Sequence, residues 1–356
     1  MQLKLSASRL PFAPLLLIAP FFLWGTAMVA MKGVIPHTTP LFMAGVRLLP
    51  AGVLILVAAA LMGRPQPQGW QAWLWISLFG LVDGTLFQGF LAEGLVRTSA
   101  GLGSVMIDSQ PLAVALLSLW LFQERIGFWG WLGLGLGVTG ISLIGLPDEW
   151  IFHWLGTPGN IIIGNWQDLF ASGEWLMLLA ALSMAIGTVL IRFVTRYADP
   201  VSATGWHMII GGLPLWGVSA VTESQQWQNI VAPDWLALGY ATVFGSAIAY
   251  GLFFYFASSG SLTSLSSLTF LTPVFALLFG NLFLSEILSP LQWIGVALTL
   301  ISIYLINQRD NLAGQKQTLN VTETTTTQQP QVLEVSSKKL NSVSLKVRES
   351  EAETLP

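Results

Sequence analysis

Long apolar runs separated by short polar breaks dominate the chain from residue 10 to residue 307. A helix needs about 20 apolar residues to cross a bilayer core about 30 Å thick, and the runs have roughly that length. Because they are continuous rather than alternating, and because lipid offers no partner to an open backbone, they predict helices rather than barrel strands. The ten predicted spans are residues 10–32, 40–61, 70–92, 99–122, 127–146, 174–194, 201–221, 234–257, 262–284 and 289–307.

The pattern changes after Asn307, where the chain becomes polar and rich in Thr and Gln. Such a segment carries too little apolar surface to offset its ordering entropy, so residues 308–356 are predicted to be a disordered cytoplasmic tail. Over the whole chain 53% of residues are hydrophobic and only 9% are charged, too few charges to cover a water-facing globule. The net charge of −3 argues against nucleic acid as a partner.

Basic residues are distributed unequally between the polar breaks. With the N-terminus inside, the inner segments carry Lys4, Arg9, Arg64, Arg125, Arg192, Arg196 and Arg309, whereas the outer segments carry only Lys32 and Arg97. Because inner loops of membrane proteins are enriched in Lys and Arg, both termini are predicted to be cytoplasmic. We expect a multi-pass protein in a plasma membrane of the bacterial inner-membrane type.

An internal repeat appears at an offset of 162 residues. It aligns Pro111 with Pro273, Glu124 with Glu286, Trp131 with Trp293 and Gly133 with Gly295. The predicted halves are residues 10–146 and 174–307, joined by an extracytoplasmic linker at 147–173. Because five spans is an odd number, the second half should enter the membrane inverted. The predicted fold is an all-α membrane protein of two inverted five-helix repeats, which favours alternating access to a central site.

Three features of these halves carry a resemblance to a known family: LWGTAMVAMKG near the start, P-x12-E, and the W-x-G helix that ends each half. The chain resembles the EamA-type ten-helix exporters of the drug/metabolite transporter superfamily. The resemblance implies a carrier for small metabolites or drugs, often proton-coupled, and does not identify the substrate.

Asp108 lies in an otherwise apolar predicted span, three residues before Pro111. A carboxylate at the centre of a membrane helix costs about 2.5–3.5 kcal/mol on insertion scales, so it marks a candidate functional site. Asp108 is the predicted proton-coupling residue, able to alternate between protonated and ionised forms. The alternative is a structural Asp108 that stays protonated or pairs permanently with Arg47. Pro111 and Pro273 are predicted helix kinks because proline lacks a backbone N–H.

The predicted substrate cavity begins with three deep polar residues. Arg47, some seven residues inside the second span, cannot readily lose its charge, so it either contacts substrate or pairs with Asp83 or Asp108. Asp83 either lines the cavity or has a packing role. With a two-residue shift of the alignment, which pairs Pro40 with Pro200, His207 is the repeat counterpart of Arg47. It either titrates in a proton relay or is a hydrogen-bonded packing residue.

Further deep residues complete the predicted site. Gln88 and its repeat counterpart Tyr250, together with Trp24 and Trp206, either enclose a partly apolar cargo or pack the core. Glu124 and Glu286 occupy equivalent span ends on opposite sides of the membrane. They are candidate gate or rim residues, with a capped interfacial turn as the alternative.

Motifs for other chemistry are missing from the sequence. It contains no Cys, no H-E-x-x-H motif, no nucleophile elbow and no P-loop, and only three scattered His. We therefore expect no enzyme, no metal and no cofactor. The predicted function is a secondary transporter that exports a small organic metabolite or drug, with protons as the coupling ion. The alternatives are a membrane receptor or sensor, and an importer or antiporter of the same fold; a homodimer is left open.

Overall fold

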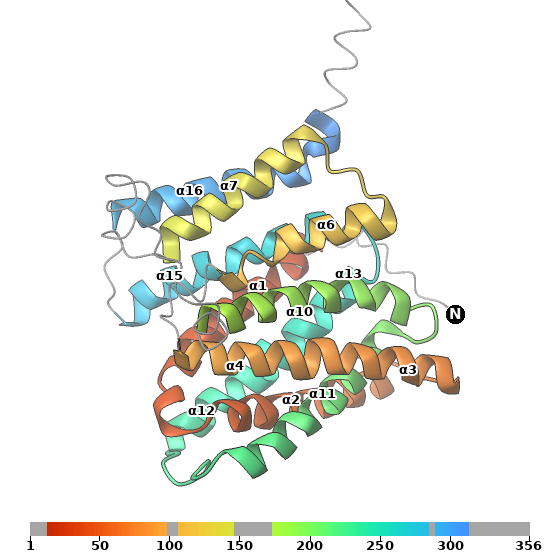
Figure 1. The fold of residues 1–356 in the computed structure, drawn as a ribbon, viewed down its shortest axis with the longest axis vertical. Coiled ribbons are helices and arrows are strands. Elements are labelled where there is room, and N and C mark those ends of the chain that lie inside the picture. The colour runs from red at the N-terminus through yellow and green to blue at the C-terminus, as the bar shows by residue number, and fades with distance from the viewer. Residues whose placement is uncertain (1–12, 98–105, 146–172, 285–288, 313–356) are drawn as a thin grey trace, which may run out of the picture. The chain divides into compact units, whose positions relative to one another are not determined.

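The computed structural model describes residues 13–97, 106–145, 173–284 and 289–312, and every element among them is helical. The chain forms two compact units, residues 1–307 and 308–356. The elements of the first unit are α1 (Ala13–Lys32), η2 (Ile35–His37), α2 (Pro40–Leu61), α3 (Gly69–Phe79), η3 (Gly80–Phe87), α4 (Gln88–Arg97), α6 (Gln110–Phe122), α7 (Gly127–Gly145), α10 (Gly173–Val194), α11 (Pro200–Thr222), α12 (Ala232–Tyr240), η4 (Ala241–Ile248), α13 (Ala249–Ala257), α14 (Leu262–Ser267), η5 (Leu268–Phe270), α15 (Leu271–Leu284) and α16 (Pro290–Asn307). Figure 1 shows their arrangement.

Membrane-crossing length and apolarity are met by seven helices among the described residues. These are Pro40–Leu61, Gly69–Arg97, Gly127–Ile144, Trp175–Val194, Ala232–Ala257, Leu262–Phe279 and Pro290–Asn307. Two shorter apolar helices, Leu15–Met31 and Gln110–Phe122, fall in the first and fourth predicted spans. The seventh predicted span is α11, which has 23 residues but is not among the seven. The predicted linker 147–173 and the tail lie almost wholly outside the described residues.

The fourth predicted span differs from the expectation of one helix over 99–122. Residues 98–105 lie outside the described residues, Asp108 and Ser109 form a turn, and α6 begins at Gln110. Pro111 therefore lies in the first turn of α6, where its missing N–H costs nothing, instead of kinking an uninterrupted helix. Pro273 likewise lies in the first turn of α15, directly after the 3₁₀ segment η5.

In the described part of each half, one span has a π-helical middle. In the first half η3 interrupts the helix between α3 and α4, and in the second half η4 interrupts the helix between α12 and α13. Such segments are rare and occur frequently at functional sites. Gln88 is the first residue after η3, and Tyr250 is the second residue after η4.

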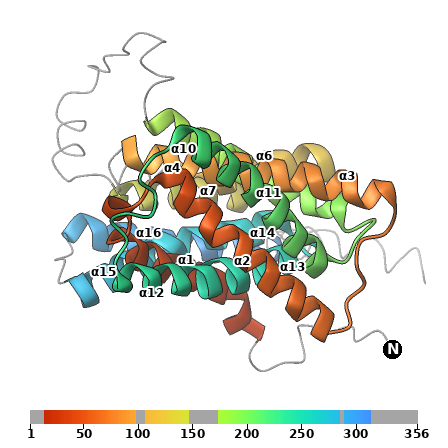
Figure 2. The ribbon, with the colours of Figure 1, turned by 90° about the horizontal axis from the view of Figure 1, so that it is seen from below.

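The two halves run in opposite directions, as their equivalent helices α2 and α11 show. The N-cap residue of α2, Thr39, donates a 2.7 Å hydrogen bond to Glu223 at the end of α11. At the other end Arg64, just beyond α2, lies 3.3 Å from Asp199, the N-cap of α11. Figures 1 and 2 show the two helices side by side, and these contacts make them antiparallel.

A second equivalent pair, α7 and α16, is antiparallel too. Gly133 packs on Ile306, Gly140 packs on Thr299 and Gly295, and the Gln292 side chain donates to the carbonyl of Ile144. Figure 1 shows these helices side by side. The structure thus confirms an inverted pair of repeats, while the side of the membrane that each end faces stays a prediction.

Glu223, the C-cap residue of α11, also acts as an N-terminal cap for α2. Its carboxylate accepts hydrogen bonds from the backbone N–H groups of Leu41 (2.9 Å) and Phe42 (3.0 Å) and from the Thr39 hydroxyl. These N–H groups have no partner within the helix. A negative charge at this end also interacts favourably with the helix dipole.

Glu223→Ala should lower the free energy of unfolding by about 1–2 kcal/mol, because two helix-end donors lose their acceptor. Glu93→Ala is the matched control: it removes the surface pair with Arg97, which is worth about 0.3–0.5 kcal/mol. Thermal unfolding of the purified proteins in detergent measures both. Equal midpoints for the two variants would contradict the capping role.

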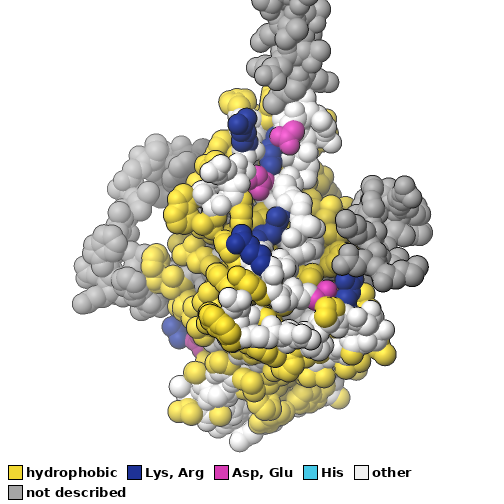
Figure 3. Space-filling model, turned by 90° about the vertical axis from the view of Figure 1, so that its right-hand side faces the viewer, with side chains coloured by type: hydrophobic (Ala, Val, Ile, Leu, Met, Phe, Trp, Pro, Cys, Tyr) yellow, Lys and Arg dark blue, Asp and Glu magenta, His cyan; other side chains and the backbone are white. Residues whose placement is uncertain are grey.

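Charged residues gather where several helix ends meet. Arg64 contacts Asp199, Arg192 donates to the carbonyls of Ala257 (2.6 Å) and Gly260, and the Ser261 hydroxyl donates to Glu124. The ends of α2, α6, α10 and α13 therefore lie at one end of the bundle. Figure 3 views the face at the right of Figure 1, on which basic and acidic side chains are grouped.

Candidate functional site: a cavity between the two halves

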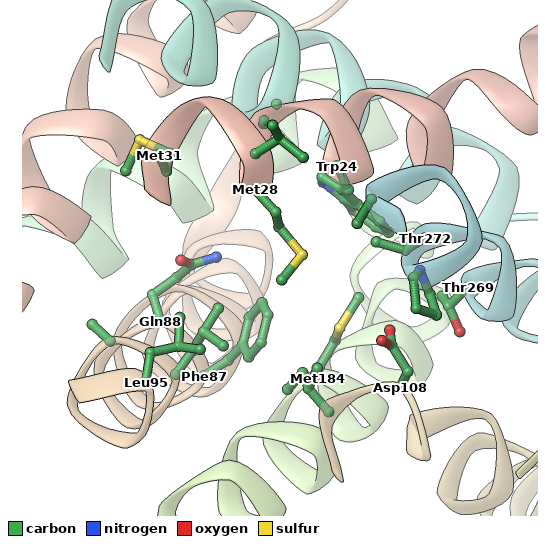
Figure 4. Close-up of a pocket in the computed structure, with 18 of the residues that line it drawn as sticks. Trp24, Met28, Met31, Phe87, Gln88, Leu95, Asp108, Met184, Thr269 and Thr272 are labelled. Atoms are coloured by element: carbon green, nitrogen blue, oxygen red, sulfur yellow. The ribbon is translucent and has the colours of Figure 1, made fainter. Parts of the chain in front are cut away.

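A cavity of about 370 Å³ lies within the first unit, and both halves contribute to its walls. Met28 of α1 and Phe87 of η3 lie on one side, and Met184 of α10 and Thr272 of α15 lie on the other (Figure 4). Most of the lining is apolar, which is typical of sites for small organic molecules. Five of the residues predicted to form the substrate or coupling site line it: Trp24, Arg47, Gln88, Asp108 and Tyr250.

A chain of two hydrogen bonds connects three of these residues. Arg47 Nη2 donates to Gln88 Oε1 at 2.6 Å, and Gln88 Nε2 donates to the Tyr250 hydroxyl at 2.7 Å. Gln88 and Tyr250 are 162 positions apart, which is the offset of the internal repeat. Residues at equivalent positions that touch must lie near the axis relating the halves, so these two hydrogen bonds mark the boundary between the halves of the first unit.

Asp108 lies in the turn before α6 and is 6% exposed. Figure 4 shows its carboxylate on the side of the cavity formed by Met184 and Thr269. Among the described residues Arg47 forms no ion pair with a carboxylate, so the predicted pairing of Arg47 with Asp108 or Asp83 is absent.

Asp83 and His207 pair with each other and are not among the cavity-lining residues. His207 Nε2 lies 3.1 Å from Asp83 Oδ2, and its Nδ1 lies 2.6 Å from the Thr204 carbonyl oxygen. The imidazole stacks on Phe79 with ring centroids 4.1 Å apart. Both side chains are fully enclosed by protein, at 0% and 1% exposure.

The hydrogen-bond contacts of His207 determine how many protons this pair carries. A carbonyl oxygen can only accept, so Nδ1 of His207 carries a proton. The contact between Nε2 and Asp83 then holds one proton, either on the ring or on the carboxyl. The pair has no net charge in either form, which is how two ionisable groups remain inside a membrane bundle.

Trp206 and Glu124 do not belong to the cavity lining described above. Trp206 lies outside the cavity, where Nε1 donates to Gln66 Oε1 at 2.9 Å and the ring packs on Trp73. Glu124, just beyond α6, accepts from Ser261, the N-cap of α14, so it contacts a neighbouring helix start. Glu286 lies outside the described residues. The gate role of both glutamates stays a prediction.

Sequence reasoning missed Gln110 and Thr272, which both line the cavity. Gln110 Nε2 donates to Thr188 Oγ1 at 3.2 Å. Gln110 and Thr272 are separated by 162 positions, and each directly precedes the proline of its half. A search for polar residues beside both repeat prolines would have found them.

Comparisons with known proteins agree with this architecture. A model described as the EamA-like transporter family matches residues 11–146 and 171–308. The uncharacterized transporter sll0355 of Synechocystis sp. is 69% identical over 301 residues, covering 85% of this chain and 91% of that protein. The WAT1-related protein At3g02690, chloroplastic, of Arabidopsis thaliana is 55% identical, covering 82% and 68%. A solved structure titled "Crystal structure of protein" is similar in fold, with a TM-score of 0.67, 18% identity, and coverage of 82% and 94%.

Proposed function

Because the chain belongs to the EamA-like transporter family, we propose that it exports a small organic molecule by alternating access, driven by inward proton movement. The protein is a multi-pass membrane transporter. The observation that carries the finer proposal is the cavity, which both halves line and which holds one acidic residue, Asp108, among its described walls. Export, proton coupling and an inner-membrane location with cytoplasmic termini are parts of this proposal.

The inverted halves support alternating access. Antiparallel equivalent helices allow the two halves to exchange conformations, giving inward-open and outward-open states of similar energy around one site. The hydrogen bond between Gln88 and Tyr250 lies where such an exchange has its centre. Cargo bound beside this contact would be reached from one side at a time.

Asp108 is the proposed proton-coupling residue. Its carboxylate lines the cavity, and it lies at the start of α6 instead of inside a regular helix, so a small change of backbone can alter its access to water. Protonation would remove its charge in one state and restore it in the other. Coupling follows because the cargo and the proton share the same cavity.

The test is uptake by proteoliposomes whose interior is more acidic than the medium, supplied with a bacterial metabolite extract and read by mass spectrometry. At least one compound should accumulate above the level in protein-free vesicles. Asp108→Asn should lower the gradient-driven part about tenfold, equivalent to about 1.4 kcal/mol of coupling free energy.

Glu93→Gln is the matched control, because Glu93 pairs with Arg97 outside the cavity lining and its loss should leave uptake unchanged. Unchanged gradient-driven uptake in Asp108→Asn would reject the coupling role. Absence of any uptake by the wild-type protein would reject the carrier mechanism.

A further inference from the structure

We infer that the cargo carries a carboxylate, and that this carboxylate binds a donor wall made of Arg47, Tyr250 and Trp24. The inference rests on the proposed function in one respect: it takes the cavity as the cargo site. All three residues line that cavity. The donor wall presents more hydrogen-bond donors than acceptors to the cavity.

Arg47 carries a positive charge that it cannot lose. One of its nitrogens, Nη2, donates to Gln88, whereas Nε is buried and has no acceptor among the described residues. No described carboxylate pairs with the guanidinium. Arg47 is partly buried, and a cation held there without a counter-charge is costly, so an anion in the cavity would stabilise it.

Tyr250 and Trp24 extend the donor wall. The Arg47 contact directs Gln88 Oε1 toward the guanidinium, and so Gln88 Nε2 donates to the Tyr250 oxygen. The hydroxyl proton of Tyr250 therefore remains available to a further acceptor. The ring of Trp24 lies 5.1 Å from that of Tyr250, and its buried Nε1–H has no acceptor among the described residues.

An ionised carboxylate complements this wall because it offers only acceptors, and because a guanidinium binds it in a two-bond geometry. Charge limits the anion further. Arg47 is the one basic residue among the described lining, so it balances a single negative charge on the cargo while Asp108 is protonated. Among these residues a second negative charge has no cation to balance it. A monocarboxylate fits this balance better than a phosphate ester, which carries about 1.5–2 negative charges.

The rest of the cavity determines what kind of molecule can carry the carboxylate; we call the part outside the carboxylate its body. Its walls contain Met28, Met31, Met43 and Met184 together with Phe87 and Leu91. Methionine side chains adapt to different apolar shapes, and the volume of about 370 Å³ suits a small molecule. The ligand class is therefore a small monocarboxylate with an apolar, aromatic or branched body.

Three probes with the same body separate charge from shape: phenylpropanoate, phenylpropanamide and phenylpropylamine. Calorimetric titration of the purified full-length protein in detergent at neutral pH should give a Kd for the carboxylate at least about 10-fold below that of the amide, as expected for charge-assisted hydrogen bonds. Arg47→Gln should remove this preference. Trp24→Phe, which keeps an aromatic side chain of smaller size and removes one donor, should weaken carboxylate binding about 3-fold to 10-fold.

Arg97→Gln and Trp206→Phe are the matched controls, since both residues lie outside the cavity lining and should not change carboxylate affinity. Equal affinity of the wild type for amide and carboxylate would overturn the inference, as would an unchanged preference in Arg47→Gln. If Arg47→Gln does not fold, an undiminished affinity in Trp24→Phe overturns the donor wall by itself.

The outcomes also separate this inference from the proposed transport. Proteoliposomes that take up only cationic or neutral metabolites would keep the carrier assignment and reject the carboxylate wall. Carboxylate binding without uptake of any metabolite would keep the wall and reject transport.

Discussion

Replacing Asp83 with leucine should lower the free energy of unfolding by about 2–3 kcal/mol, because it leaves Nε2 of His207 enclosed without a partner. The loss stays below that for an uncompensated buried charge, since a neutral imidazole remains once the carboxyl is gone. Asp83→Asn should retain most of the stability. Its amide N–H can donate to Nε2 while Nδ1 still donates to Thr204.

Thermal unfolding of wild type, Asp83→Leu and Asp83→Asn in the same detergent measures this difference. The ordering is the informative result: the asparagine variant close to wild type and the leucine variant well below. Equal destabilisation by both would show that the contact with His207 contributes little, and that packing of Asp83 against Gly187 matters instead.

Gly211→Ala should lower the free energy of unfolding by about 3 kcal/mol, because α11 and η3 meet there backbone to backbone. A Cβ atom added at residue 211 would lie 2.5 Å from the Gly80 carbonyl oxygen and 2.8 Å from the Gly84 carbonyl carbon. Backbone atoms cannot turn away as a flexible side chain can, so the helices must separate. The hydrogen bond from Thr85 to the Gly211 carbonyl, 2.9 Å long, would then be strained.

Gly217→Ala on the same helix is the matched control, since no atom lies within 4 Å of its added Cβ. It should be neutral or stabilising by up to about 1 kcal/mol through helix propensity. Both variants are compared by thermal midpoint and by the monodisperse fraction in size-exclusion chromatography. Similar midpoints would mean that α11 and η3 tolerate separation.

Prediction from sequence succeeded where a signal is local. The apolar runs located helices close to the ten spans expected, because each residue partitions between lipid and water largely on its own. With a two-residue shift, the repeat alignment indicated that α2 and α11 are equivalent helices of inverted halves. The 162-residue offset itself indicated the same for α7 and α16. It also paired Gln88 with Tyr250, which proved to touch.

The candidate site was predicted in part. Trp24, Arg47, Gln88, Asp108 and Tyr250 were expected at the site and line the cavity. Their partners were not foreseen. The sequence suggested Asp83 or Asp108 as the ion-pair partner of Arg47. In the structure Arg47 is hydrogen-bonded to Gln88, and Asp83 pairs with His207. Opposite charge suggested the first pairing, but depth and facing direction on packed helices decided the second.

By itself, the sequence determined that this chain is helical, embedded in lipid and built from two related halves, since hydropathy and repetition are properties of the linear order. Only the tertiary structure decided which polar groups meet. The His207–Asp83 pair joins residues 124 positions apart, and the Gln88–Tyr250 contact joins residues 162 positions apart. Such pairings depend on how the helices cross and rotate, and on π-helical segments that shift the facing of every later residue. No local pattern of apolar and polar positions contains that information.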